Sequence, residues 1–585
     1  MQSPPPNGEN SSSSSSNPCN CHSCCLSPNL LGFPNSQLDH QNSANITNSS
    51  TFHYDFATAT TSSLYPNTQF TNPDCLPSLQ ESIKRFTRAF PLFLDTVEAD
   101  RVRKTEYPHL TLSSHVCLDY SGHALFSFSQ KNAEFAASSS STPPLSPTHF
   151  EDVSESEFEF KLRRRIMRYL NVLEDDYSLF FAANQVSAFG VLGESYPFKS
   201  NKRVLTVYDH ENEAVEAMIE RSRNRGARVL SAEFKWPKLK INCAKLQEML
   251  MEGHKKKKNK RREKGLFVFP IQSRVTGARY SYQWMNLAQE NDWHVCLDAT
   301  GLGPKDMDTL GLTLIRPDFI ICTFYSVFGD DPSGFACLFV KKSTLSIFTQ
   351  PNISSAPGIT SLKYFLRTSG YEPRNFRAAK SDDPNEEIEC RGLDHADSLG
   401  LVRIGTRTRC LINWLTNAMG TLSHPNSEKG VQLVTIYGPR VGFDRGPALA
   451  FNVFDWKGEK IDPWLVQKLA DRNNISLGCG FIKHIGFSER YREEEGRVWA
   501  LEKGSEEKER KGKGKKGERN ERRIGVVIAS IGFLTNFEDV YRLWEFVSKF
   551  LDADFVEKER WRYMALNQKT IQKILEIFIR YVSTI

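Results

Sequence analysis

The 585-residue chain has no run of about 18 consecutive apolar residues, so the sequence predicts no transmembrane helix. Its first six residues, Met1–Pro6, have neither a basic start nor an apolar core, and they therefore do not have the pattern of a secretory signal. Hydrophobic residues make up 39% of the chain and charged residues 25%, which is typical of a soluble globular protein. From these features we expect a cytoplasmic protein.

The chain also lacks a general excess of positive charge. The net charge is +6, but residues 255–264 carry +7 and residues 503–523 carry +5, so the rest of the chain sums to −6. Short basic tracts of this kind are usually solvated loops, and we expect no nucleic-acid partner. The alternative is that the two tracts direct nuclear entry or attract RNA, in which case binding should weaken steeply with salt.

Composition shifts along the chain predict its organisation. The first part is rich in Ser, Asn and Pro and should be disordered. Four cysteines between Cys19 and Cys25 do not match the two-pair spacing of a zinc ribbon, so we expect no metal site there. The expected regions are a tail over 1–75, a large domain over 76–425 with a basic loop at 254–264 and an excursion at 350–389, a C-terminal subdomain over 426–555 with a basic insertion at 503–523, and a helical tail over 556–585.

Strand and helix patterns alternate between residues 158 and 340, which predicts crossover units and a mostly parallel sheet covered on both faces. Ligands of such sheets bind beyond the carboxyl ends of the strands, and Asp298 and Ser326 lie at or just past such ends. The expected strands are 177–183, 204–207, 229–234, 265–270, 294–298, 319–324, 335–340, 434–436, 448–453 and 526–531, and the expected helices are 162–173, 185–194, 210–223, 280–290, 399–422, 463–473, 537–551 and 570–582. A further helical pattern begins at Leu76, because Leu79, Ile83, Phe86, Phe90 and Phe93 recur at three- and four-residue steps.

Several segments resemble, in the same order, the N-terminal domain of the molybdenum cofactor sulfurase family. Leu118–Ser127 resembles its "LDHAGATLYS" element, Gln272–Tyr280 its "QSNFSGVKYP" element and Arg445–Asn452 its "RGP…FN" strand. Pro317–Gly329 resembles its cofactor segment. The resemblance covers roughly 76–555 and implies an α/β fold of the PLP-dependent transferase (class V aminotransferase-like) kind. That fold has a large domain with a mostly parallel sheet and a smaller α+β C-terminal subdomain.

The resemblance implies pyridoxal phosphate (PLP) as the cofactor, but three positions depart from the family pattern. Ser326 stands where the family has its Schiff-base lysine, and a serine hydroxyl cannot form an imine. Val186 replaces a phosphate-binding threonine, and Ile528 replaces an arginine that meets the substrate carboxylate. Three losses in one pocket predict a catalytically degenerate protein that holds PLP at most non-covalently.

Other residues match the family's cofactor contacts. Asp298 matches the carboxylate that pairs with the ring nitrogen, although a capping aspartate after a strand has the same pattern. His210 matches the residue that stacks on the ring, with a surface or N-cap residue as the alternative. At the phosphate end, Thr323 and Tyr325 match two phosphate contacts of the family, and Asn184 and Ser187 are candidates to compensate for the hydroxyl that is missing at Val186.

A desulfurase also needs a reactive thiol and an amine. Cys479 follows a glycine, as the family's cysteine does, but it lacks the preceding Arg-Thr pair and any nearby positive charge, so a structural thiol is the alternative. Lys305, seven residues past Asp298, is the one candidate for a displaced Schiff-base lysine that we consider.

Two hypotheses follow. The first is a sulfurase-like protein that has lost its chemistry and has a binding or regulatory role toward an unidentified protein or small molecule. The alternative is an active PLP-dependent cysteine desulfurase or sulfurtransferase in molybdenum cofactor sulfuration that uses Lys305. Because relatives of this fold build the pocket across a two-fold interface, we expect a homodimer by analogy.

Overall fold

The computed structural model describes residues 68–112, 114–120, 135–138, 157–252, 264–303, 305, 315–324, 335–348, 359, 361–364, 391–425, 432–439, 445–509 and 522–565. Several sequence predictions lie outside these residues. They concern most of the N-terminal tail with its cysteine cluster, nearly all of the first basic loop, most of the excursion at 350–389, Tyr325, Ser326 and the helix expected over 570–582.

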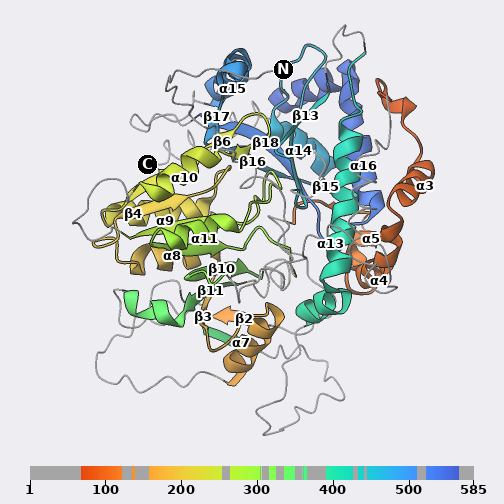
Figure 1. Ribbon diagram of the computed structural model, residues 1–585. Coiled ribbons are helices and arrows are strands. Elements are labelled where there is room, and N and C mark those ends of the chain that lie inside the picture. The colour runs from red at the N-terminus through yellow and green to blue at the C-terminus, as the bar shows by residue number, and fades with distance from the viewer. Residues whose placement is uncertain are drawn as a thin grey trace, which may run out of the picture.

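A seven-stranded sheet forms the centre of the larger part of the molecule (Figure 1). Six strands run parallel, and β11 alone is antiparallel to both of its neighbours, β3 and β10. This confirms the expected α/β class with a mostly parallel sheet. In spatial order the strands are β3 (Tyr177–Ala182), β11 (Ala336–Lys341), β10 (Phe319–Thr323), β9 (Trp293–Asp298), β8 (Gly265–Pro270), β4 (Arg203–Thr206) and β5 (Arg228–Ser231).

Helices cover both faces of this sheet, which explains why its central strands are apolar without alternation. Every residue of β8 and of β9 is buried. One face packs against α8 (Gln185–Ser195) and α9 (Glu213–Asn224), and the other packs against α7 (Glu157–Tyr169), α10 (Cys243–Met251) and α11 (Gln283–Glu290). Asn212 caps α9 by accepting a hydrogen bond from the amide of Ala214, so this helix begins after His210 rather than at it.

A second core lies around a four-stranded antiparallel sheet. Its strands are, in spatial order, β13 (Val434–Tyr437), β14 (Ala448–Val453), β18 (Ile524–Ser530) and β16 (Gly478–Ile482). The helices α13 (Arg391–Met419), α14 (Pro463–Arg472) and α16 (Phe537–Ser548) pack into the same core. In α13 the backbone at Gly400 leaves the helical region with φ of 75°, a value that favours glycine.

The first N-terminal helix packs into this second core, whereas α4 (Val97–Glu106) and α5 (Pro108–Leu112) contribute side chains to the core of the seven-stranded sheet. Phe86 of α3 (Leu79–Ala89) contacts the ring of Phe537, with ring centroids 4.4 Å apart. The short strand β1 (Val116–Cys117) pairs in parallel with β15 (Ile475–Ser476). A division at residue 425 therefore separates segments that share one hydrophobic core, because Phe86 packs against Phe537 and α13 supplies Trp414 to the same cluster.

Other elements refine the expected boundaries. The second basic tract was expected to be a loop from residue 503, but α15 (Arg492–Glu509) continues into it. A helix over residues 553–565 carries the buried Val556 and the ion pair between Arg472 and Glu559. The remaining elements are α4 (Val97–Glu106), α5 (Pro108–Leu112), β2 (Phe135–Ser138), β6 (Phe234–Lys235), β7 (Lys240–Ile241), β12 (Ser361–Tyr364), β17 (Ile485–Gly486) and the 3-10 turns Pro73–Cys75, Pro91–Thr96, Lys342–Ile347, Glu489–Tyr491 and Lys549–Leu551.

Within the described residues, no helix is both long enough and apolar enough to cross a bilayer. The same residues contain no group of three or more His, Cys, Asp or Glu side chains placed to hold a metal ion.

Candidate cofactor site

Asp298 lies at the carboxyl end of β9 and is 2% exposed. The hydroxyl of Tyr208 donates to its Oδ2 at 2.7 Å. Its Oδ1 accepts two hydrogen bonds from Thr300, one from the backbone amide at 2.9 Å and one from the hydroxyl at 2.6 Å. Both carboxylate oxygens are therefore engaged by groups of this chain, and Asp298 does cap the turn that follows its strand.

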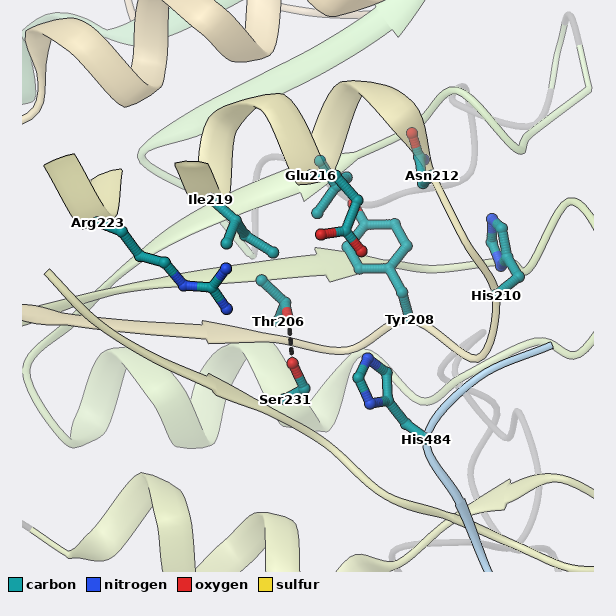
Figure 2. A pocket seen from close by; sticks show the side chains of 10 residues that line it. Thr206, Tyr208, His210, Asn212, Glu216, Ile219, Arg223, Ser231 and His484 are labelled. Carbon is teal, nitrogen blue, oxygen red and sulfur yellow. Dashed lines mark hydrogen bonds between the residues drawn. The ribbon is translucent and has the colours of Figure 1, made fainter. Parts of the chain in front are cut away.

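Tyr208 reaches Asp298 from the extended segment that follows β4. Thr206, Tyr208 and His210 are two residues apart, so their side chains lie on one face of that segment. Figure 2 shows the Tyr208 ring rising from this segment toward α9. Burial, and next the charge of Asp298, raise the pKa of Tyr208 well above its usual value, so the hydroxyl stays protonated and is a donor.

The sequence analysis missed Tyr208. The available signal was its two-residue spacing from His210, which places both side chains on the face that Asp298 also occupies.

His210 is buried at 4% exposure, and the N-cap of α9 is Asn212, so the surface and N-cap alternatives for His210 are wrong. Its Nδ1 is 2.7 Å from Oδ1 of Asp209, and its ring lies edge-on to that of Tyr208, with centroids 5.9 Å apart. Its Nε2 is buried and has no hydrogen-bond partner among the described residues. Its backbone bridges to Ile482, which joins the large sheet to the C-terminal subdomain.

Asp209 anchors this histidine. Ser273 donates to Oδ1 of Asp209 at 2.7 Å, and Thr276 donates to Oδ2 at 2.5 Å. Burial, the largest influence, would raise the pKa of Asp209, but the hydrogen bonds from His210, Thr276 and Ser273 outweigh it and lower the pKa. The His210 ring is therefore held in one orientation by a charged, fully buried neighbour.

The N-terminus of α8, where the resemblance places the phosphate, is already capped. The side-chain oxygen of Asn184 accepts from the amide of Ser187 at 2.9 Å, and that amide is one of those an anion would use. Gln185 donates to the Thr300 hydroxyl at 2.9 Å, which links this helix end to the Asp298 group. Thr323 is half-buried at the end of β10.

Cys479 has the surroundings of a structural thiol. It lies on β16, and its Sγ is 3.4 Å from the carbonyl oxygen of Pro463. Burial, followed by the charges of Asp462, Asp119 and Asp471, raises its pKa to about 12. A nucleophilic cysteine needs a lowered pKa, so these surroundings oppose that role. Ile528, on the neighbouring β18, is buried at this end of the sheet.

Lys305 is engaged elsewhere in the molecule. Its ammonium forms an ion pair with Asp397 of α13 at 2.6 Å and donates to the carbonyl of Tyr169 at 3.3 Å. It also lies 4.2 Å from the centroid of the Tyr169 ring at the end of α7. These contacts hold the amine against helices that supply none of the groups around Asp298.

A small polar cleft adjoins Tyr208 and His210 between α9 and the strands β4 and β5 (Figure 2). Glu216 faces it and accepts from Lys483 at 3.1 Å, and the hydroxyls of Thr206 and Ser231 are 3.2 Å apart within it. Its lining is completed by Asn212, Val215, Ile219, Arg223 and His484.

The chain is related in sequence to molybdenum cofactor sulfurases. It is 25% identical to the human protein over 415 residues, which is 65% of this chain and 44% of the human one. It is 23% identical to the Arabidopsis thaliana protein over 429 residues, 67% of this chain and 51% of that one. The chain thus spans about half the length of the curated relatives it matches. No family model matches it.

Among solved structures, the chain is similar to cysteine desulfurases. The apo enzyme from Thermococcus onnurineus NA1 aligns with a TM-score of 0.48 at 13% identity, covering 77% of this chain and 97% of that one. The Escherichia coli cysteine desulfurase CsdA aligns with a TM-score of 0.46 at 14% identity, covering 77% and 98%.

The described residues do not fit PLP bound in the way the resemblance implies. The carboxylate expected to pair with the ring nitrogen already accepts three hydrogen bonds from Tyr208 and Thr300. The helix end expected to bind the phosphate is capped by Asn184. A ring nitrogen would therefore have to use the one acceptor position that these three hydrogen bonds leave, on the Oδ2 that already accepts from the buried Tyr208.

Proposed function

We propose that this chain is a catalytically degenerate relative of molybdenum cofactor sulfurase that acts by binding and regulation and not by PLP chemistry. The observation that supports this most strongly is the closed hydrogen-bonding group of Asp298, Tyr208 and Thr300. An electron-sink cofactor needs a carboxylate at its ring nitrogen, and here groups of this chain occupy three of about four acceptor positions of that carboxylate.

The sequence supports the same proposal from a separate direction. Ser326 stands where the resemblance places the Schiff-base lysine, and Lys305, the alternative amine, is ion-paired with Asp397. Cys479 has a raised pKa where a sulfur-accepting thiol needs a lowered one. Each group that the chemistry requires is thus replaced or engaged elsewhere.

A titration of the full chain with PLP tests the proposal. We expect no stoichiometric visible absorbance band, no single borohydride-trapped lysine in peptide maps and no sulfide release from cysteine. An active cysteine desulfurase treated in parallel is the positive control. A single lysine labelled at one equivalent per chain, Lys305 above all, would overturn the proposal, as would sulfide release above the no-protein blank.

The proposal includes a homodimer, by analogy with the fold, and a cytoplasmic location, which is the expectation from the sequence. Light scattering of the purified chain tests the first, and fractionation of cells that express it tests the second. A monomer at micromolar concentration would contradict the predicted homodimer. It would not affect the proposed loss of PLP chemistry, which rests on the hydrogen bonds of Asp298.

A further inference from the structure

The resemblance assigns Asp298 and His210 to the two contacts with a pyridine ring, and both residues contact the side chain of Tyr208. Its hydroxyl donates to Asp298 at 2.7 Å, and its ring lies edge-on to the imidazole of His210 with centroids 5.9 Å apart. The Tyr208 side chain is 4% exposed, and its ring packs in the apolar cluster that joins α8 and α9 to the sheet.

The tyrosine ring matches a protonated pyridine in shape and in the hydrogen-bond donor that it offers to Asp298. Both are flat six-membered rings, and both present one hydrogen-bond donor in the ring plane to a carboxylate. They differ in charge, because the phenol is neutral. The Asp298 carboxylate accepts three hydrogen bonds from neutral donors, one from Tyr208 and two from Thr300, and these stabilise it in its buried position without a positively charged ring.

We propose that Tyr208 is a built-in occupant of the ring site, which satisfies Asp298 and fills the space beside His210 without any bound cofactor. The inference rests on the proposed function and adds that the Tyr208 side chain takes the place of the cofactor ring. It assigns a ligand class to the site once the tyrosine is removed: a flat six-membered ring with a donor at one end, such as a para-substituted phenol or a hydroxypyridine.

His210 sharpens this assignment. Its Nε2 is buried and unpartnered among the described residues, so Tyr208 leaves one polar atom of the site unsatisfied. A ring that carries a further hydroxyl group can supply that missing hydrogen bond. We therefore expect a hydroxypyridine to bind the vacated site more tightly than a simple phenol.

The experiment removes the ring and returns it as a small molecule. Thermal unfolding of the full-length Tyr208→Ala variant is followed with and without 4-methylphenol, and with and without 4-deoxypyridoxine, which has the pyridine ring but no aldehyde. Tyr196→Ala is the matched control. Tyr196 is also buried in the same cluster, and its hydroxyl is hydrogen-bonded to His294 Nδ1 at 2.7 Å. Among the described residues, it has no hydrogen bond or ring contact to Asp298 or His210.

The expected result is selective rescue. A ligand present at about one hundred times its Kd raises the ratio of folded to unfolded protein about one hundred-fold. 4-Deoxypyridoxine should therefore raise the unfolding midpoint of Tyr208→Ala and leave the wild type and Tyr196→Ala unchanged. 4-Methylphenol should raise the midpoint of Tyr208→Ala at higher concentration. Toluene, which lacks the donor, should be weaker than 4-methylphenol.

Two results would overturn the inference. One is an equal shift of the wild type by 4-deoxypyridoxine, since the site would then be open with Tyr208 in place. The other is a folded Tyr208→Ala variant that responds to neither ring. If that variant aggregates, the yield of refolding with and without each ligand gives the same readout, and no gain in yield counts against the inference. Tyr208→Phe keeps the ring, so it should fold whether or not Tyr208→Ala aggregates.

The two proposals fail separately. PLP trapped on one lysine of the wild type would refute the proposed function whatever the rescue data show. A wild type that stays colourless with PLP, together with an unrescued Tyr208→Ala, would refute only the role of Tyr208.

Discussion

Arg103 and Asp539 form a buried, two-pronged ion pair that joins α4 to α16 across 436 positions of the sequence. Nη2 of the arginine is 3.0 Å from Oδ1, and Nη1 contacts Oδ2 as well as the carbonyl oxygen of Leu534 at 2.9 Å. The two side chains are 9% and 4% exposed. This pair fixes the N-terminal helices to the C-terminal subdomain, as does their shared apolar core.

Replacement of Arg103 by alanine should destabilise the protein strongly. It leaves Asp539 buried without its counter-charge, and loss of one partner of such a pair costs about 3–5 kcal/mol. The exposed pair of Arg101 and Glu98, 3.6 Å apart on the same helix, provides the control. Arg101→Ala should cost at most about 1 kcal/mol. Urea unfolding measures both variants, and equal losses would contradict the structural role of the buried pair.

Cys479 should resist alkylation in the folded protein. Burial and three nearby acids raise its pKa to about 12, so at pH 8 almost none of it is the reactive thiolate. Cys75 is exposed and provides the internal reference. Iodoacetamide followed by peptide mass spectrometry should label Cys75 first and Cys479 only after unfolding. Rapid labelling of Cys479 in the native chain would revive it as a sulfur-accepting nucleophile.

His294 should make stability fall as the solution is acidified. Burial, the largest cause, lowers its pKa below 6.5, so as the pH falls below about 6.5 the unfolded chain binds more protons at this site than the folded chain does. Its stabilising contribution is therefore present above about pH 6.5 and is lost below it, at up to about 1.4 kcal/mol per pH unit. Protonation also removes the acceptor that Nδ1 offers to the Tyr196 hydroxyl.

The variant His294→Gln checks this dependence, because glutamine does not titrate and its amide oxygen can still accept from Tyr196. The difference in unfolding free energy between wild type and variant should shrink or reverse between pH 7.5 and 5.5. Identical pH profiles for the two proteins would show that another group causes any loss in acid.

The sheet was predictable from the sequence because its strands are buried on both faces and so appear as continuous apolar runs. The sequence predicted Gly265–Pro270 to the residue, and Trp293–Asp298 differs from its prediction by one residue. The shared core of the N-terminal helices was not predictable in this way. Periodicity shows that Phe86 lies on an apolar face, but it cannot show that the partner is Phe537, which is distant in sequence.

The candidate site was predictable only in part, for a related reason. A family pattern identifies positions, so it pointed to Asp298 and His210, which are both buried and both contact Tyr208, but it says nothing about a residue that the family does not use. Tyr208 is identified only in the folded structure, where the segment after β4 places its hydroxyl within hydrogen-bonding distance of Asp298 at the end of β9. Asn184 was expected as a compensating phosphate contact, and the structure shows it capping its own helix.

Restoring the lysine alone should not restore cofactor binding. With Ser326→Lys the chain regains an amine at the family position, but the Tyr208 ring still fills the site and its hydroxyl still holds Asp298. We expect no stoichiometric visible band when PLP is added to this single variant. The double variant Ser326→Lys/Tyr208→Ala should develop the band, and borohydride trapping should label residue 326.

Ser326→Lys/Tyr196→Ala is the matched control, because it carries the same lysine and a cavity of the same size in the same cluster. It should remain colourless, which separates an opened ring site from general loosening of the core. Neither double variant should release sulfide from cysteine, since Ile528 still stands where the resemblance implies an arginine for the substrate carboxylate. A full band from Ser326→Lys alone would mean that PLP displaces Tyr208 unaided, and that the missing amine is then the only barrier to cofactor binding.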